Sequence, residues 1–181
     1  NFSALWLLHC EEFTDSAFEI NIRGCFNVLK LIEKYKIKRY IFSSSASVYG
    51  DALYEPMDEA HPKNPTTLYA AGKASADMAL ESYVQMFDLD AFIVRPFNNY
   101  GPRQNYKGLL AGIIPKTANR IFLNQSPELH GNGLQTRDFI YVYDTIDAVI
   151  KIFNVLDKGD SVNISTDNCI QIKKLLEMII D

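Results

Sequence analysis

The sequence has few cysteines, no strong excess of charge and no long apolar run, and each shortage excludes a class of protein. The three cysteines among 181 residues, Cys10, Cys25 and Cys169, lie far apart, which argues against a disulfide framework and favours a reducing compartment. The net charge of −4 lacks the basic excess that a nucleic-acid or anionic-membrane surface requires. We therefore expect no nucleic-acid partner and no membrane partner.

Targeting and metal-binding signals are also scarce. The longest apolar run near the start, Ala4–Leu8, is too short to span a bilayer and has no basic segment before it, which indicates a cytoplasmic protein. His9, His61 and His130 show no metal-ligand spacing with the cysteines, so we expect no metal. A composition of 48% hydrophobic and 22% charged residues, without repeats, favours one globular domain over residues 1–181.

Strand-like and helix-like patterns alternate along the chain. The segments predicted as extended are Ser3–His9, Tyr40–Phe42, Asp90–Arg95, Leu129–Gly133 (a strand end with a turn), Thr136–Val142 and Ser161–Ile164. The segments predicted as helical are residues 18–32, 68–87, 114–122, 144–156 and 170–180. This alternation favours an α/β fold with a doubly wound, Rossmann-like parallel sheet and helices on both faces.

Hydroxyl groups follow one of these strands directly. Ser43–Ser45 come after the apolar run Tyr40–Phe42, at the carboxyl end of a strand, where parallel sheets bind ligands. The helix predicted to begin near Leu68 carries Tyr69 and Lys73 four residues apart, and so on one face. The sequence therefore places candidate catalytic residues at this strand end and on this helix.

A Tyr–Lys pair at this spacing is chemically useful, because a tyrosine with a pKa near 10 is a poor base at neutral pH. Lowering that pKa by about 3 units requires about 4 kcal/mol, which a cation about 4 Å away supplies at an effective dielectric of about 20. Lys73 is thus sufficient in magnitude to activate Tyr69, and Ser45 could polarise a substrate hydroxyl. Chance alone readily produces one such pair, so its weight comes from the Ser-rich strand end before it and the polar loop after Asp90–Arg95.

Four linked motifs resemble the extended short-chain dehydrogenase/reductases, and within them the NAD-dependent nucleotide-sugar epimerases and dehydratases. The motifs are Ser43–Gly50, Tyr69 with Lys73, Arg95–Gln104 and Thr136–Val142. They occur in the family's order and are most similar in pattern to the UDP-glucose 4-epimerases. The resemblance implies NAD as the cofactor and a nucleotide-diphosphate sugar, most simply a UDP-sugar, as the substrate.

The resemblance also implies roles for single residues. Tyr69 matches the general base, Lys73 the residue that lowers its pKa and binds the nicotinamide ribose, and Ser45 the hydroxyl that bonds the reacting sugar oxygen. The implied cofactor-binding residues are Asn21, Tyr69, Lys73 and Phe97, and the implied substrate-binding residues are Ser45, Asn98 and Arg137. Arg137 suits a diphosphate because a guanidinium offers several fixed donors. A surface ion pair with Asp138 is the alternative for Arg137, and a turn position is the alternative for Asn98.

The chain departs from the family at its beginning. Family members open with a strand and a glycine-rich turn that binds the dinucleotide pyrophosphate, and no such motif occurs here. At about 30 residues per βαβ unit, roughly 60 residues of the cofactor-binding region would be absent. We therefore expect a fragment of a longer chain that lacks the first strands and is inactive alone, in which the part after about residue 96 contributes the substrate-binding region.

The expected reaction of the whole protein is epimerisation at C4 through a 4-keto intermediate, with NAD regenerated in each cycle. Family members that eliminate water carry acidic residues where this sequence has Ala46 and Ser47, and neither of these transfers a proton usefully near neutral pH. The alternatives are an NAD(P)-dependent nucleotide-sugar dehydratase or reductase, and a non-catalytic fragment or pseudoenzyme that serves as a binding module.

Two predicted helices carry more apolar or small residues than one sheet face requires. These residues are Phe26, Val28 and Leu29 on the first helix, and the alanines with Met78 and Tyr83 on the second. Together with the resemblance, this surplus predicts a homodimer that pairs through a helix bundle.

Overall fold

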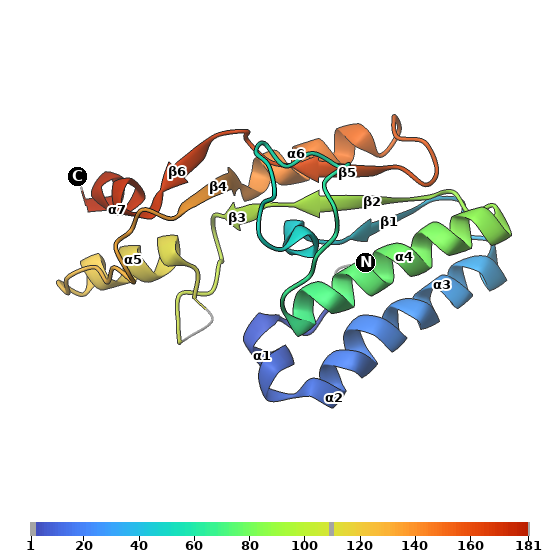
Figure 1. Cartoon of the computed structure of the whole chain (residues 1–181), viewed down its shortest axis with the longest axis horizontal. Helices are drawn as coiled ribbons and strands as arrows, with labels where there is room; N and C mark the ends of the chain where they lie inside the picture. The colour runs from blue at the N-terminus through green and yellow to red at the C-terminus, as the bar shows by residue number, and fades with distance from the viewer. Residues whose placement is uncertain (1–2, 109–110, 181) are drawn as a thin grey trace. The chain divides into compact units, whose positions relative to one another are not determined.

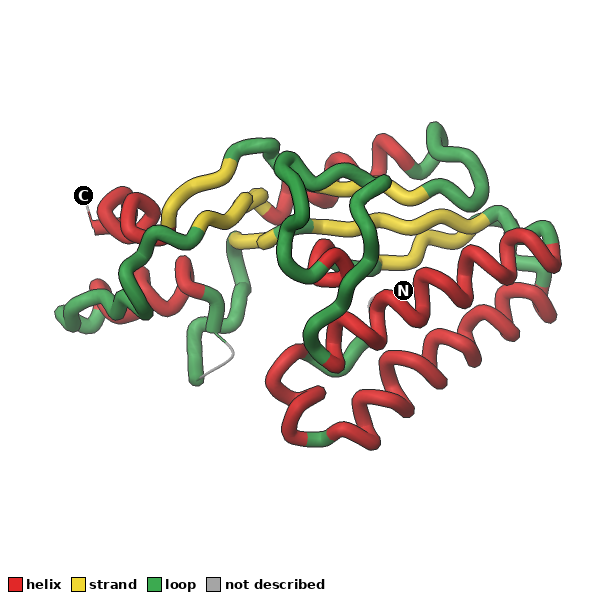
Figure 2. The backbone as a smooth tube through the Cα atoms, viewed as in Figure 1, coloured by secondary structure: helices red, strands yellow, loops and turns green. Residues whose placement is uncertain are grey.

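The computed structural model describes residues 3–108 and 111–180, with helices and strands following one another along the chain (Figures 1 and 2). These residues divide into two units. The first unit runs up to Pro96 and resumes at Ala148–Ile164, and the second holds Phe97–Asp147 and the residues from Ser165 onward. Within the described residues, each unit contains a three-stranded sheet.

The sheet of the first unit is parallel, with the strand order β1-β2-β5. Its strands are β1 (Tyr40–Ser43), β2 (Ala91–Pro96) and β5 (Ser161–Ile164). The central strand β2 is buried from Ala91 to Arg95, as expected for a parallel strand that is covered on both faces. The predictions of these three strands and of their parallel pairing are confirmed.

Helical segments cover both faces of this sheet. The helices α3 (Gly24–Tyr35) and α4 (Leu68–Phe87) pack against one face. The core between them and the sheet includes Leu29, Ile32, Phe42, Leu80, Val84 and Ile93. On the other face Phe153, which follows α6 (Val142–Ile152), lies with its ring centroid 6.3 Å from that of Phe92. Each large apolar side chain buried in this way contributes about 1.5–3 kcal/mol.

The segment before α3 does not form the predicted strand at Ser3–His9. It folds into α1 (Leu7–Glu12), α2 (Thr14–Ala17) and a π-helical segment, η1 (Phe18–Arg23). A short apolar run cannot be assigned to strand or helix by periodicity alone, and leucine and glutamate favour the helix. The backbone of Leu5 pairs with the side chain of Asn21 rather than with a strand. The strand prediction was therefore wrong.

The helix predicted over residues 18–32 is confirmed, although its first part is π-helical. Of the apolar residues at helical spacing in this segment, Cys25, Leu29 and Ile32 are buried, whereas Phe18 and Phe26 are exposed. A π-helical turn spaces its hydrogen bonds five residues apart, which rotates Phe18 away from the face that α3 presents to the sheet. The buried face of this helix is thus shorter than the predicted helical segment.

The second unit combines parallel and antiparallel pairing. Its strands are β3 (Asn98–Tyr100), β4 (Thr136–Tyr141) and β6 (Cys169–Gln171), and its helices include α5 (Ile113–Phe122) and α7 (Ile172–Ile180). Strand β4 pairs with β3 in parallel and with β6 antiparallel. The predicted extended run at Thr136–Val142 and the helices near Ile114 and Ile170 are confirmed.

Other predictions for the second unit were wrong. Of the strand end with a turn predicted at Leu129–Gly133, the turn is confirmed, with φ of +70° at Gly131 and +72° at Gly133, but the strand is absent. Strand β3 lies in a predicted loop, and the antiparallel β6 contradicts an all-parallel sheet. Three-residue strands are too short to show alternation, and the direction of pairing depends on distant contacts.

Across the described residues, no helix combines the length and the apolar content that crossing a membrane would require.

Candidate active site

The end of β1 holds its serines in a fixed arrangement. The amide of Ser44 donates to the carbonyl of Val94 at 2.8 Å, which continues the pairing of β1 with β2. Ser45 is the N-cap of a 3-10 helix, η2 (Ala46–Tyr49), and its Oγ accepts hydrogen bonds from Ser47 N at 3.2 Å and from Ser47 Oγ at 3.0 Å. The Ser45 oxygen is therefore oriented by the turn that follows the strand.

Helix α4 brings Tyr69 and Lys73 to the same place. The helix begins after Thr67, whose side chain caps it by accepting from Ala70 N at 3.2 Å. Tyr69 is half-buried and Lys73 is 5% exposed. The Nζ of Lys73 donates to the carbonyl oxygen of Ser43 at 2.7 Å. The structure thus brings Ser45, Tyr69 and Lys73 together within the first unit. The spacing of Tyr69 and Lys73 in the sequence did not predict that Lys73 bonds the Ser43 carbonyl.

The acid–base balance of this cluster differs from the expected one. Burial raises the pKa of the Tyr69 phenol, and the interaction with the Ser45 hydroxyl lowers it only in part, while the nearby thiol of Cys10 adds to the rise. The Nζ of Lys73 lies 5.9 Å from the Tyr69 ring centroid and donates to the Ser43 carbonyl. Burial also lowers the pKa of Lys73. The predicted lowering of the Tyr69 pKa is therefore not present in this arrangement.

Asn21 lies in η1 and is 3% exposed. Its side-chain amide pairs with the backbone of Leu5 in both directions, accepting from Leu5 N at 2.6 Å and donating to Leu5 O at 2.9 Å. Its Nδ2 also donates to Cys10 Sγ at 3.3 Å. A Cβ on Gly72, which lies between Tyr69 and Lys73, would stand only 2.8 Å from the Cβ of Asn21. Asn21 therefore packs directly against the stretch of α4 that carries Tyr69 and Lys73.

A buried polar network beside this cluster was not predicted. Arg95 Nε donates to Asp77 Oδ2 at 3.1 Å, and Arg95 NH1 donates to the Tyr49 hydroxyl and to Ser161 Oγ, each at 3.0 Å. The Tyr49 hydroxyl in turn donates to Asn163 Oδ1 at 2.8 Å. Two signals in the sequence point to this network: the charge of Arg95 in an otherwise apolar strand, and the position of Asp77 two helical turns after Tyr69.

The other predicted site residues belong to the second unit. Phe97 is half-buried, and Asn98 and Arg137 are exposed. Asn98 Nδ2 donates to the carbonyl of Asp138 at 2.7 Å, so this side chain links β3 to β4. Arg137 NH1 donates to the carbonyl of Thr136 at 2.7 Å. Arg137 therefore keeps most of its guanidinium donors at the surface.

The alternative of an ion pair between Arg137 and Asp138 is not observed among the described residues. Asp138 is buried, and its carboxylate accepts hydrogen bonds from Thr166 N and Thr166 Oγ1 at 3.1 and 2.7 Å and from Asn168 N at 3.3 Å. Its role is to anchor the segment that leads to β6, which explains why an acidic residue is buried at this position.

Sequence comparison defines the class of protein to which these features belong. Residues 9–165 match the NAD dependent epimerase/dehydratase family. The chain therefore belongs to the NAD-dependent epimerase/dehydratase family, as its four motifs indicated.

Relatives of two reaction types are similar to this chain. A protein assigned as a UDP-glucose 4-epimerase in Methanocaldococcus jannaschii is 37% identical over 162 residues, which cover 89% of this chain and 52% of the relative. Human dTDP-D-glucose 4,6-dehydratase is 32% identical over 170 residues, which cover 90% and 47%. A solved structure of UDP-N-acetylglucosamine 4-epimerase from Methanobrevibacter ruminantium, in complex with UDP-N-acetylmuramic acid, superposes with a TM-score of 0.93 at 32% identity and covers 98% and 57%. The chain spans about half the length of the curated relatives it matches.

Proposed function

We propose that the whole protein epimerises a nucleotide-diphosphate sugar at C4 through a 4-keto intermediate. The observation that carries this proposal is the proximity of the Ser45 hydroxyl and the Tyr69 phenol at the carboxyl end of β1, with the buried ammonium of Lys73 one turn further along α4. A hydroxyl donor, a phenol and a cation in one place suit the removal and return of a sugar hydroxyl proton. Membership of the family supports a nucleotide sugar as the substrate.

The residues of the first unit fit the nicotinamide end of NAD. The ammonium of Lys73 has three N–H donors, of which one bonds the Ser43 carbonyl, so the others suit the ribose hydroxyls. Tyr69 lies on the same stretch of α4, and Asn21 packs against it. When bound at these residues, NAD would supply the hydride chemistry that epimerisation at C4 requires.

In this proposal Tyr69 takes the proton of the 4-hydroxyl, and Ser45 donates a hydrogen bond to the same sugar oxygen. Burial raises the pKa of Tyr69 in the present structure, so base catalysis requires more stabilisation of the phenolate than Ser45 provides. We assign that role to Lys73, the buried cation whose Nζ lies 5.9 Å from the Tyr69 ring centroid.

The choice of epimerase over dehydratase depends on η2. Elimination of water requires a further acid and base beside the sugar, and the residues after Ser45 are Ala46 and Ser47. The hydroxyl of Ser47 already donates to Ser45 Oγ at 3.0 Å, so it serves to orient Ser45. A dehydratase is the second candidate, because the human dTDP-D-glucose 4,6-dehydratase is nearly as similar to this chain as the archaeal relative. A reductase, which needs the same side chains, and a non-catalytic binding module remain further alternatives.

We propose that the part of the chain after about residue 96 contributes the substrate-binding region. Arg137 is exposed and offers several N–H donors that suit a diphosphate. Asn98 uses its Nδ2 on the Asp138 carbonyl, so its side-chain oxygen is the atom that can accept from a ligand. Phe97, half-buried, supplies an apolar ring that suits the nicotinamide.

The deciding assay supplies the whole protein with a UDP-hexose and NAD and separates the products by chromatography. A C4 epimer without net NADH supports the proposal, whereas a 4-keto-6-deoxy product would reject it in favour of the dehydratase. Net oxidation or reduction of the sugar would identify a reductase. The full gene distinguishes an enzyme from a non-catalytic binding module, because tight binding of NAD requires a glycine-rich turn. Its absence from the full gene would favour the binding module.

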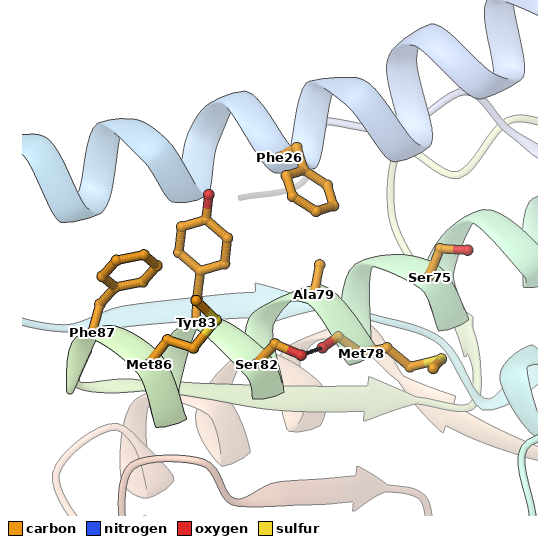
Figure 3. A pocket seen from close by; sticks show the side chains of 8 residues that line it. All are labelled: Phe26, Ser75, Met78, Ala79, Ser82, Tyr83, Met86 and Phe87. Carbon is orange, nitrogen blue, oxygen red and sulfur yellow. Dashed lines mark hydrogen bonds between the residues drawn. The ribbon is translucent and has the colours of Figure 1, made fainter.

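We further propose that the whole protein forms a homodimer through α3 and α4. Exposed apolar side chains gather on these two helices: Phe26 and Leu31 on α3, and Met78, Met86 and Phe87 on α4. A groove of about 540 Å³ lies between them, and Figure 3 shows the rings of Phe26, Tyr83 and Phe87 along it. Clusters of this kind commonly mark interaction surfaces. The expected contributions of Leu29 and Ala76 do not apply, because these side chains are buried in the core of the first unit, whereas Ala79 lines the groove.

The dimer is tested by light scattering of the whole protein at micromolar concentration. We expect a dimer, and we expect Met78→Glu to shift it toward monomer, because burying an unpaired charge in an apolar interface costs several kcal/mol. Leu53→Glu is the matched control, since Leu53 is as exposed as Met78 (68% and 61%) but lies in the loop before α4. A monomeric parent protein, or equal effects of both substitutions, would reject this interface.

A further inference from the structure

One face of α4 carries Tyr69, Lys73 and Asp77 and packs against the end of β1 and against β2. These three residues lie four positions apart in the sequence, which places them on one side of the helix. Tyr69 meets the hydroxyl of Ser45, and Lys73 donates to the carbonyl of Ser43 at 2.7 Å. Asp77 accepts from Arg95 of the central strand β2 at 3.1 Å. The position of α4 along its own axis therefore decides whether all three contacts form together.

The last of the three positions is anchored by a buried ion pair. The side chains of Asp77 and Arg95 are 0% and 1% exposed, and Arg95 Nε donates to Asp77 Oδ2 at 3.1 Å. Arg95 belongs to the central strand β2 and also donates to the Tyr49 hydroxyl in η2 and to Ser161 Oγ in β5. The pair thus connects α4 to β2, and through Arg95 to η2 and β5.

Such a pair resists displacement of the helix. A shift of one residue along α4 is about 1.5 Å, which would separate the Arg95–Asp77 and Lys73–Ser43 contacts at once. Moving either partner of a buried ion pair leaves an uncompensated charge away from water, which is strongly unfavourable. At a reacting centre a misplacement of about 1 Å can reduce the rate about 100-fold.

We infer that Asp77 and Arg95 are positioning residues for Tyr69: their buried ion pair sets the position of α4 along its axis, so that the Tyr69 phenol meets the Ser45 hydroxyl at the end of β1. The geometric part of this inference stands by itself. Its consequence for turnover rests on the proposed function.

The direction of the change in the Tyr69 pKa separates positioning from a direct charge effect. The groups that face Tyr69 are the Ser45 hydroxyl at the N-cap of η2, the Cys10 thiol in α1 and the Lys73 ammonium in α4. Loss of the Ser45 interaction raises the pKa of Tyr69. Loss of a negative charge at Asp77, with the geometry unchanged, would lower it, because the phenolate would meet less repulsion.

The test follows the ionisation of Tyr69 in protein labelled with ¹³Cζ-tyrosine, with the Tyr69 resonance assigned from its absence in Tyr69→Phe. We expect Asp77→Asn to raise the pKa of Tyr69 about as far as Ser45→Ala does, and the double variant to raise it no further, as required for two changes that remove one contact. Glu81→Gln is the matched control, because Glu81 lies one turn further along α4, is partly exposed and only approaches Arg95 at 3.9 Å. It should leave the Tyr69 pKa unchanged.

An unchanged or lowered Tyr69 pKa in Asp77→Asn, or additive shifts in the double variant, would overturn the inference. If Asp77→Asn does not fold, Arg95→Lys keeps both charges and removes the guanidinium fork, and an upward shift of the Tyr69 pKa is again expected. In the epimerase assay Asp77→Asn should reduce kcat at least about tenfold with KM unchanged. A protein without epimerase activity would refute the proposed function, while the Tyr69 titration would still decide the positioning role.

Discussion

Substitution of Gly72 tests whether η1 and the stretch of α4 that carries Tyr69 and Lys73 are as closely packed as the structure indicates. Gly72 lies between Tyr69 and Lys73, and a Cβ added there would stand 2.8 Å from the Cβ of Asn21. The neighbouring atom is the first atom of a buried side chain, which cannot rotate away. Gly72→Ala must therefore separate the two helices locally or displace Asn21 from its hydrogen bonds with Leu5.

Opposing effects determine the size of the change. Alanine gains roughly 0.5–1 kcal/mol over glycine inside a helix. Overpacking costs about 1–3 kcal/mol, and each lost Asn21–Leu5 hydrogen bond costs about 1 kcal/mol more. We therefore expect Gly72→Ala to reduce the free energy of unfolding by about 1–3 kcal/mol.

The measurement is urea unfolding followed by circular dichroism, with Gly24→Ala as the matched control. Gly24 has helical φ and ψ of −58° and −45°, and a Cβ there would meet its nearest described atom, the Glu19 carbonyl oxygen, at an ordinary 3.5 Å. Gly24→Ala should therefore raise the free energy of unfolding by up to about 1 kcal/mol. If both variants are stabilised alike, the close packing of Asn21 against α4 is refuted.

Further predictions concern Tyr69 and Arg137. Tyr69→Phe should abolish turnover of the whole protein without unfolding it, and substantial residual turnover would reject Tyr69 as the base. Because burial raises the pKa of Tyr69 above its ordinary 10.0, its contribution to stability is complete below pH 10 and is lost as the pH rises through the folded-state pKa. The parent should therefore lose stability above pH 10 more steeply than Tyr69→Phe in urea titrations, and identical alkaline profiles would contradict the buried phenol. Arg137→Ala should weaken nucleotide-sugar binding by about 1.5–3 kcal/mol, or about 10- to 100-fold by calorimetry, and an unchanged dissociation constant would return Arg137 to a surface role.

Much of the first unit was predictable because its information is local. The helix predicted at residues 68–87 and the strand predicted at Ser161–Ile164 have the bounds of α4 and β5. Apolar periodicity, an N-capping threonine and bounding polar segments act over a few residues and can be read directly. The pairing of Tyr69 and Lys73 on one helix face also follows from spacing alone.

Contacts between distant residues were decided only by the tertiary structure. The partner of Lys73 is the carbonyl of Ser43, 30 residues away, and burial raises the Tyr69 pKa that the spacing led us to expect lowered. The same holds for the buried ion pair of Asp77 and Arg95, because the sequence does not show which residue either charge pairs with. By itself, the sequence determined which groups the site contains and which helix and strand carry them. Their hydrogen bonds and protonation depend on burial and distance, which arise only when α4 packs against β1 and β2.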